Sequence, residues 1–429
     1  MKQSLYILGF ICGTLLLPLS GFGQFTVTGE FRPTAEVRDG YRYLSSDKLK
    51  PAYLISQRTR VGFFYEHEWI KTGVSFQDVR LWGDETVYSS TGVQGDLASI
   101  DLNEAWVQLS FLKKSSLKIG RQYFNYDDTR LLSNRNWNNY SIKYDALLYQ
   151  YTGNKLIIDA AVSYNNQVEN YFGNFYTHAK MKTLNFVHAS YKINERFNAA
   201  LIAIATGYTK SDTTEMIYVR ATYGVIANYK TEKTTAMASV YLQNGRNDAG
   251  IKANAYNANI KAMSKVGKFN LGAGISIISG DDAIDLTTDN MFDLHYGNRH
   301  SYYGHMDFFT SMPKATNNGG LNDFFLSTQY KLDEKTTLSA DYHYFTLNQD
   351  VKDKTFPTST VYLDKGLGSE VDLNFNIKLH KIVELNGGYS FMLPTSSMLT
   401  LQNIAEADKH YSSWIWLQMV VKPVFFSNK

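Results

Sequence analysis

The chain has 429 residues, a formal charge of +3 and a mean hydropathy of −0.30, and this low hydropathy excludes a bundle of membrane-spanning helices. Aromatic residues make up 14% of it, with 31 Tyr and 25 Phe against only 7 Pro. Such a composition suits many strands that end in aromatic girdles. The near-neutral charge gives no sign of a nucleic-acid partner.

The first residues have the layout of a secretory signal peptide. Lys2 precedes an apolar run over residues 5–19, and the small residues Gly21 and Gly23 follow it. The run is too short to span a bilayer comfortably. We therefore expect residues 1–23 to be a cleaved signal peptide and residues 24–429 to form a single domain.

Cys12 is the only cysteine of the chain, and it lies inside this apolar run. Ile11 stands before it, where a lipidation signal requires a small residue. Removal of the signal peptide leaves no thiol, which excludes disulfides, thiolate metal sites and cysteine nucleophiles from the mature chain.

Side chains of the mature chain alternate between apolar and polar, as in strands with one face toward lipid and one toward water. Around residues 59–65, Val61 and Phe63 face one way, and Arg58, Arg60 and Gly62 face the other. Further strands are expected at 105–111, 156–164, 199–204, 235–242, 271–277, 324–330, 338–344, 371–379 and 414–421.

Short turns alternate with long loops between these segments. Tight polar turns are expected at 113–116, 194–195, 231–233 and 333–335, and longer polar loops at 44–51, 89–99, 281–300, 312–320 and 348–366. This alternation predicts an all-β fold, a transmembrane up-and-down antiparallel β-barrel whose closure leaves no edge in lipid. Removing 23 residues from 429 leaves 406, which at roughly 22 residues per strand and connection gives about 18 strands, with 16 as the alternative.

The end of the chain also fits a barrel. Residues 414–421 alternate, and Phe425 and Phe426 lie almost at the terminus, although Ser427, Asn428 and Lys429 follow them. A terminal strand that ends in Phe is what the barrel assembly machinery reads, so we expect that machinery and outer-membrane lipid to be partners.

Several short segments stand in a distinctive order and spacing. They are Arg58-Thr59-Arg60, QDVRLWG at 77–83, LNEAWV at 102–107, LKIGRQ at 117–122, DTRL at 128–131, Trp137 and Asp145-Ala146, with a weaker echo at 292–297, 304–307 and 319–323. In this order the chain resembles the alginate-export family of outer-membrane porins. The resemblance implies an 18-stranded barrel that passes an anionic polyuronate through an arginine-lined constriction.

Nine of the 13 arginines lie in the first third of the chain. Guanidinium groups bind carboxylates in a bidentate manner and stay charged at any biological pH, which suits repeated weak binding of uronate units. The alternative is that these arginines only satisfy neighbouring carboxylates in a polar lumen or extend to the rims. The predicted lumen residues are Arg58, Arg60, Arg80, Arg121 and Arg130, with Asp78 and Glu104 among them.

Two other groups have the residue types of a metal site. His295, His300 and His305 lie near Asp293 and Asp307, but their spacing matches no compact ligand motif. The acidic loop at 280–289 could hold calcium, although a solvated loop is the simpler interpretation. We expect no other cofactor and no metal ligands.

No local motif of an enzyme is present in the chain. It lacks a Gly-x-Ser-x-Gly elbow, a His-Glu-x-x-His pair and a phosphate-binding glycine loop. We therefore expect no catalytic residues, and a monomeric outer-membrane channel that passes an anionic polysaccharide or oligosaccharide such as an alginate-like polyuronate. The alternatives are a general or other-substrate porin, and a surface adhesin or structural barrel with a closed lumen.

Overall fold

The computed structural model describes residues 23–83, 87–88, 94–95, 100–178, 180–355 and 361–428. The predicted signal peptide and most of the predicted loop at 89–99 lie outside this part of the chain. The spanning strands are β1 (Gln24–Asp39), β2 (Ala52–Glu66), β3 (Ile70–Leu81), β6 (Asp101–Leu112), β7 (Ser115–Gln122), β8 (Tyr144–Thr152), β9 (Leu156–Tyr164), β10 (Met181–Lys192), β11 (Phe197–Thr209), β12 (Ile217–Lys230), β13 (Thr234–Arg246), β14 (Lys252–Val266), β15 (Phe269–Ile278), β17 (Leu321–Lys331), β18 (Thr336–Thr346), β19 (Gly366–His380), β20 (Val383–Pro394) and β21 (Ser412–Val421).

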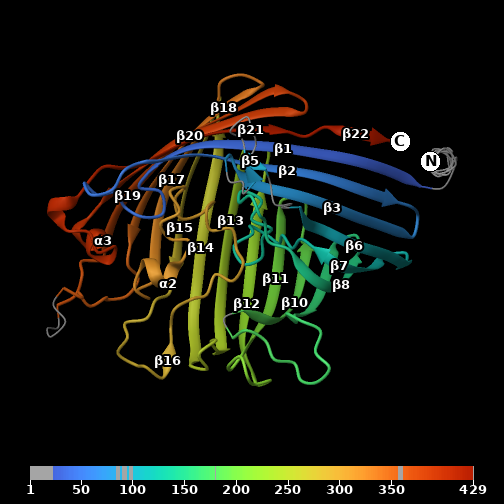
Figure 1. The fold of residues 1–429 in the computed structure, drawn as a ribbon, viewed down its shortest axis with the longest axis horizontal. Coiled ribbons are helices and arrows are strands. Elements are labelled where there is room, and N and C mark those ends of the chain that lie inside the picture. Colours follow the sequence, from blue (N-terminus) through green and yellow to red (C-terminus); the bar gives the residue numbers. More distant parts are fainter. Residues whose placement is uncertain are drawn as a thin grey trace.

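These strands form one closed antiparallel ring. Each pairs with the next along the chain, and β1 pairs with β2 on one side and with β21 and its continuation β22 (Val424–Ser427) on the other. Figure 1 shows β1 lying between β2 and the last strands. The ring contains 18 strands, which confirms the predicted fold class and the larger of the two strand counts.

The smaller elements lie in the connections. They are β4 (Val87–Tyr88), β5 (Gln94–Gly95), β16 (Thr288–Asp289), α2 (Met312–Ala315), α3 (Ser396–Leu401) and the 3-10 turn η1 (Glu406–Asp408). No helix within the described ranges is both long and apolar enough to cross a membrane.

Apolar and polar side chains alternate across the barrel wall. On β12, Tyr223 and Val225 are exposed on the outward face, whereas Thr222 and Ile226 are buried on the inward face. Lipid accepts the outward side chains, and the closed ladder pairs the backbone groups that lipid cannot hydrogen-bond.

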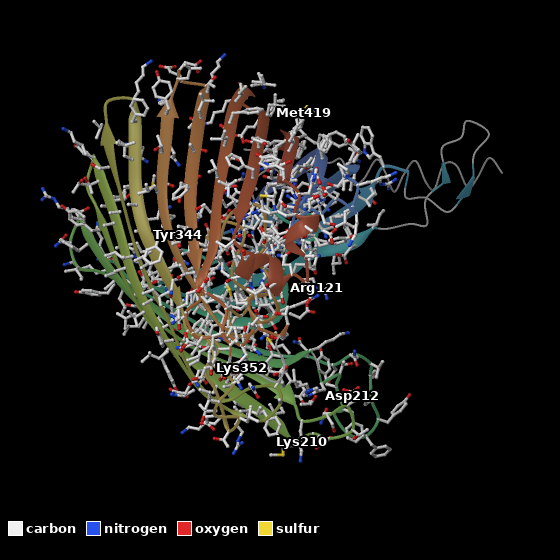
Figure 2. The ribbon with its side chains drawn as sticks, turned by 90° about the vertical axis from the view of Figure 1, so that its left-hand side faces the viewer. Arg121, Lys210, Asp212, Tyr344, Lys352 and Met419 are labelled. Carbon is white, nitrogen blue, oxygen red and sulfur yellow. The ribbon has the colours of Figure 1, made fainter. Side chains whose placement is uncertain are left out.

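The two rims differ in the length of their connections. The predicted turns at 194–195, 231–233 and 333–335 fall between paired strands at one rim, and the turn predicted at 113–116 is confined there to residues 113–114. Figure 2 shows Lys210 and Asp212 at the opposite end of the barrel from this rim, and Met419 toward it. In outer-membrane barrels the short turns face the periplasm and the long loops face outward.

Two long connections fold into the barrel. We call residues 123–143 the first inner loop and residues 279–320 the second inner loop. The backbone N–H of Tyr296 donates to the Leu131 carbonyl at 3.0 Å, and that of Asn298 donates to the Thr129 carbonyl at 2.8 Å, so the loops are joined to each other. The segments predicted as polar rim loops at 281–300 and 312–320 do connect β15 to β17, but they fold inward. Their side chains Met291, Phe292, Leu294 and Met312 are buried, as are Met306 and Phe309 between the two segments.

Candidate functional site

Four charged side chains project into the lumen from β1 and β2. Strand alternation points Glu30 and Arg32 of β1 and Arg58 and Arg60 of β2 inward, and the register sets Arg32 opposite Arg58 and Glu30 opposite Arg60. Like charges directly opposite each other on a sheet repel. Arg32 and Arg58 therefore require acceptors close at hand.

The first inner loop supplies most of those acceptors. Arg32 donates to the Asn136 carbonyl at 2.6 Å and to the Trp137 and Asn138 carbonyls at 3.1 and 3.2 Å. Arg58 is fully buried and donates to the Asn138 carbonyl at 3.1 Å and to Glu30 Oε1 at 2.6 Å. These two arginines clamp the loop at residues 136–141.

Arg60 and Lys118 are the more accessible cations of this region. Arg60 is half-buried and donates to Gln77 Oε1 at 2.9 Å and to Ser141 Oγ at 2.8 Å. Lys118 projects inward from β7, with Nζ 3.9 Å from the centre of the Trp106 ring, and interacts electrostatically with Glu104. We call Arg32, Arg58, Arg60 and Lys118 the basic wall.

Arg130 lies in the first inner loop and is buried. It pairs with Asp128 at 2.8 Å, donates to the Tyr303 hydroxyl at 3.1 Å, and lies 3.9 Å from the centre of the Tyr302 ring. This arginine joins the two inner loops to each other and is not part of the basic wall.

Three of the predicted lumen residues face outward. On β7, Arg121 shares a face with Leu117 and Ile119 and pairs with Asp145 at 2.8 Å. On β3 the inward residue is Gln77, which reaches Arg60, so the alternate residues Asp78 and Arg80 point away from the lumen. The basic wall therefore contains Arg58 and Arg60 of the predicted set, with Glu104 beside it.

The opposite side of the lumen is acidic. The register of β17, β18 and β19 sets Asp341 directly opposite Asp372 on the inward face, and His343 opposite Glu370. His343 Nδ1 lies 2.9 Å from Asp323 Oδ1. We call Asp323, Asp341, Glu370 and Asp372 the acidic wall; Asp323, Glu370 and Asp372 have no exposed surface.

The second inner loop docks on this acidic wall through its backbone. The N–H of Met306 donates to Glu370 Oε1 at 2.7 Å, and the N–H of His305 donates to Asp372 Oδ2 at 3.3 Å. Gly304 has a φ of 80° and directly contacts the Glu370 carboxylate, so a side chain there would displace it. Three buried oxygens of the wall have no hydrogen-bond partner among the described residues: Asp323 Oδ2, Glu370 Oε2 and Asp372 Oδ1.

The three histidines weighed as metal ligands serve separate contacts. His295 Nε2 lies 2.6 Å from Thr222 Oγ1, and burial lowers the His295 pKa to about 4, so its ring is neutral. His300 pairs with Asp307 at 2.9 Å, and His305 lies near Asp372. Within the described residues, no three His, Cys, Asp or Glu side chains are arranged to hold a metal ion.

In the acidic loop considered as a calcium site, the carboxylates accept hydrogen bonds from backbone N–H groups of the same loop. Asp281 accepts from the N–H of Ala283 at 2.7 Å, and Asp285 accepts from the N–H of Thr287 at 2.9 Å. Such contacts are typical of polar turns.

Sequence reasoning missed several residues of this site. Arg32 was counted among the nine clustered arginines but not placed in the predicted lumen set. Lys118, the acceptors at 136–141 and the acidic wall were not predicted as parts of the site. A usable signal was present. Asp341 and His343 stand at i and i+2 on a predicted strand, and Glu370 and Asp372 stand at i and i+2 at the start of another, so the members of each pair share a face. Which face it is depends on register, which local pattern does not fix.

The closed 18-stranded barrel, its outward apolar face and its charged lumen define an outer-membrane channel of the porin class. It is a transport protein in contact with outer-membrane lipid. The model of the alginate export family matches residues 24–395, and the chain therefore belongs to that family.

Solved porin structures share the fold at low sequence identity. OccAB4 of Acinetobacter baumannii aligns with a TM-score of 0.60 and 13% identity over 95% of this chain and 100% of its own. OpdL of Pseudomonas aeruginosa aligns with a TM-score of 0.61 and 12% identity over 94% of this chain and 99% of its own. OpdK of the same organism, solved with vanillate, aligns with a TM-score of 0.56 and 12% identity over 94% of this chain and 100% of its own. No curated protein matches the chain.

Proposed function

We propose that this channel passes an anionic polysaccharide or oligosaccharide, such as an alginate-like polyuronate, past the basic wall. The observation that carries the proposal is that Arg60 and Lys118 project into the lumen beside the first inner loop while remaining half-buried, and so within reach of a solute. Cations at a constriction favour entry of anions, and binding must stay weak enough for release. Arg58 contributes by holding the loop, with Glu104 positioned beside Lys118.

The solute moves down whatever gradient exists, so export of a polymer and uptake of its fragments are physically the same event for this chain.

We further propose that residues 1–23 are a cleaved signal peptide, that residues 24–429 form one barrel domain inserted by the barrel assembly machinery, and that the barrel is a monomer. A ring of this size closes without a partner.

A second candidate is a surface adhesin or structural barrel with a closed lumen. The observation that favours it is the apolar packing of the two inner loops inside the ring, including Phe124, Leu132, Phe292 and Phe309. A general porin for small solutes is the third candidate, because the structural neighbours include a complex with vanillate.

Proteoliposomes loaded with a mannuronate trimer or a neutral mannose trimer distinguish these candidates. The proposal expects faster release of the uronate, with the preference lost in the double variant Arg60→Gln, Lys118→Gln and retained in Arg121→Gln, whose side chain faces outward. Equal release of both trimers supports the general porin, and release of neither supports the closed barrel.

A further inference from the structure

A small polar cavity lies on the outer side of the basic wall, between β1 and the first inner loop. Its volume is about 180 Å³, and its lining includes Arg38, Tyr41, Arg42, Asn138, Asn139 and Gln418. Pockets that hold drug-sized ligands span roughly 300–1,000 Å³, so this cavity has room for a single sugar ring and not for a longer segment.

Arg42 lines this cavity and also interacts with Tyr41 and Asp307. Its side chain is 51% exposed, and its closest carboxylate, Asp307, is 3.6 Å away. Asp307 is buried and already contacts the Tyr41 hydroxyl at 2.5 Å and His300 Nδ1 at 2.9 Å. Burial alone would raise the Asp307 pKa, but His300, Tyr41 and Arg42 together lower it, so the carboxylate stays charged.

The backbone holds Arg42 in an unusual conformation. Its φ is 67°, in the left-handed region that non-glycine residues rarely adopt, and its N–H donates to the Met306 carbonyl at 2.8 Å. Strained residues of this kind persist where the surroundings fix them, and they cluster at ligand sites. The second inner loop therefore fixes the backbone from which the Arg42 side chain extends.

A second guanidinium is available across the Tyr41 ring. Arg38 directs Nε and Nη2 at the two Glu36 oxygens, at 2.8 and 3.0 Å, which leaves Nη1 for a ligand. The Arg38 and Arg42 guanidinium carbons lie 4.7 and 5.3 Å from the centre of the Tyr41 ring. Both cations are thus held around one aromatic ring.

The cavity also has a rigid aromatic side. Tyr41 stacks on Trp414 at 4.7 Å, and Trp137 stacks on His300 at 4.1 Å and meets Trp414 edge-on at 5.8 Å. Flat aromatic surface suits the apolar face of a sugar ring, and the amides of Asn138, Asn139 and Gln418 suit its hydroxyl groups.

We propose that this cavity is a binding subsite for one uronate unit of the saccharide, with the carboxylate on Arg42 and Arg38 and the sugar ring beside Tyr41 and Trp137. The subsite rests on the proposed function for its ligand class. The subsite shares no residue with the basic wall. It lies nearer than that wall to the rim that carries the long loops.

Block of single-channel current by the mannuronate trimer tests the subsite, with the mannose trimer as the neutral probe. Arg42→Gln should shorten the residence time of the uronate about tenfold or more, since a hydrogen bond to a charged group contributes about 1.5–3 kcal/mol and 1.4 kcal/mol is a factor of ten. Anion selectivity should persist, because Arg60 and Lys118 are unchanged. Arg42→Lys should recover part of the residence time, and Arg246→Gln, a rim arginine that donates to the Gly250 carbonyl, should match the wild type.

Quenching of tryptophan fluorescence in the folded, detergent-solubilised barrel measures binding without conduction, since Trp137 and Trp414 adjoin the cavity. If the uronate quenches the fluorescence of the wild type but not that of Arg42→Gln, the subsite is supported. If the wild type shows this quenching but does not conduct, only the proposed passage is overturned. Equal residence times and equal quenching in wild type and Arg42→Gln would overturn the subsite while leaving passage intact. If Arg42→Gln does not fold, the comparison of wild type with Arg42→Lys decides.

Discussion

The basic wall and the acidic wall hold the two inner loops in complementary ways. On β1 and β2, arginines donate to backbone carbonyls of residues 136–141, whereas on β19 carboxylates accept from the backbone N–H groups of His305 and Met306. The basic wall has a carboxylate, Glu30, in direct contact with its cations. The acidic wall sets two aspartates opposite each other, with His343 on Asp323 and with Lys261 and Arg130 acting on Asp341 and Asp323 electrostatically. The charges of both walls therefore position the inner loops, and the two walls differ in the groups that compensate those charges.

Removing the second inner loop should produce the largest effect. Gly280 and Gly319 are in direct contact and Ile278 pairs with Leu321, so excision of residues 281–318 can be closed as a tight hairpin. We expect conductance to rise several-fold, because the loop fills the lumen beside the acidic wall. Single-channel recording measures the change.

The control for that excision is removal of residues 211–215, which lie outside the ring between Lys210 and Met216, whose backbones are already hydrogen-bonded at 2.8 Å. This control should leave conductance unchanged. Unchanged conductance after excision of 281–318 would show that the second inner loop does not obstruct the channel.

Arg58→Gln should destabilise the basic wall by about 3–5 kcal/mol, because it leaves Glu30 and the loop carbonyls without their buried cation. The midpoint of urea unfolding in detergent measures the loss. Arg121→Gln is the matched control; its pair with Asp145 is exposed, so its loss should cost about 1 kcal/mol or less. Equal losses in the two variants would contradict the clamp.

Glu370→Gln should increase the stability of the barrel, whereas Arg58→Gln should decrease it. Glutamine still accepts the Met306 N–H through its amide oxygen, and its amide N–H can donate to Asp372 without the repulsion between two neighbouring carboxyl groups. We expect a gain of about 1–2 kcal/mol, read from the same urea midpoint. A loss of stability would mean that the acidic wall is compensated by a group other than those described.

The smallest expected effect is a pH dependence of the second inner loop. Burial lowers the His295 pKa from 6.5 to about 4, so a released loop binds a proton that the docked loop excludes. Docking should therefore be fully stable above about pH 6.5 and weaken as the pH falls toward 4. Hydrogen exchange of residues 291–298 at pH 7 and pH 4.5 measures this, and His295→Gln should remove most of the difference; an equal difference in that variant would assign the effect to other groups.

The barrel itself could be predicted because its signals are local. Each strand expected from alternation lies within an observed strand, and the segment at 156–164 coincides with β9. Eight of the spanning strands were not predicted individually, namely β1, β3, β7, β8, β10, β12, β14 and β20. In β1, Gly29, Pro33 and Ala35 interrupt the apolar residues of the outward face.

The faces of charged residues near the rim could not be predicted. On β3, Val79 points inward while Asp78 and Arg80 point outward, which reverses the usual apolar and polar faces. The inner loops were missed for a different reason, since the partners of Phe292 and Met306 are distant in sequence. Their burial depends on a ring that only long-range pairing creates.

The central claim is that the basic wall confers anion selectivity on the channel, and the reversal potential in a salt gradient across a planar bilayer tests it most directly. The wild type should show anion preference, the double variant Arg60→Gln, Lys118→Gln should lose most of it, and Arg121→Gln should keep it. A cation-selective wild type, or a double variant with an unchanged reversal potential, would contradict the claim.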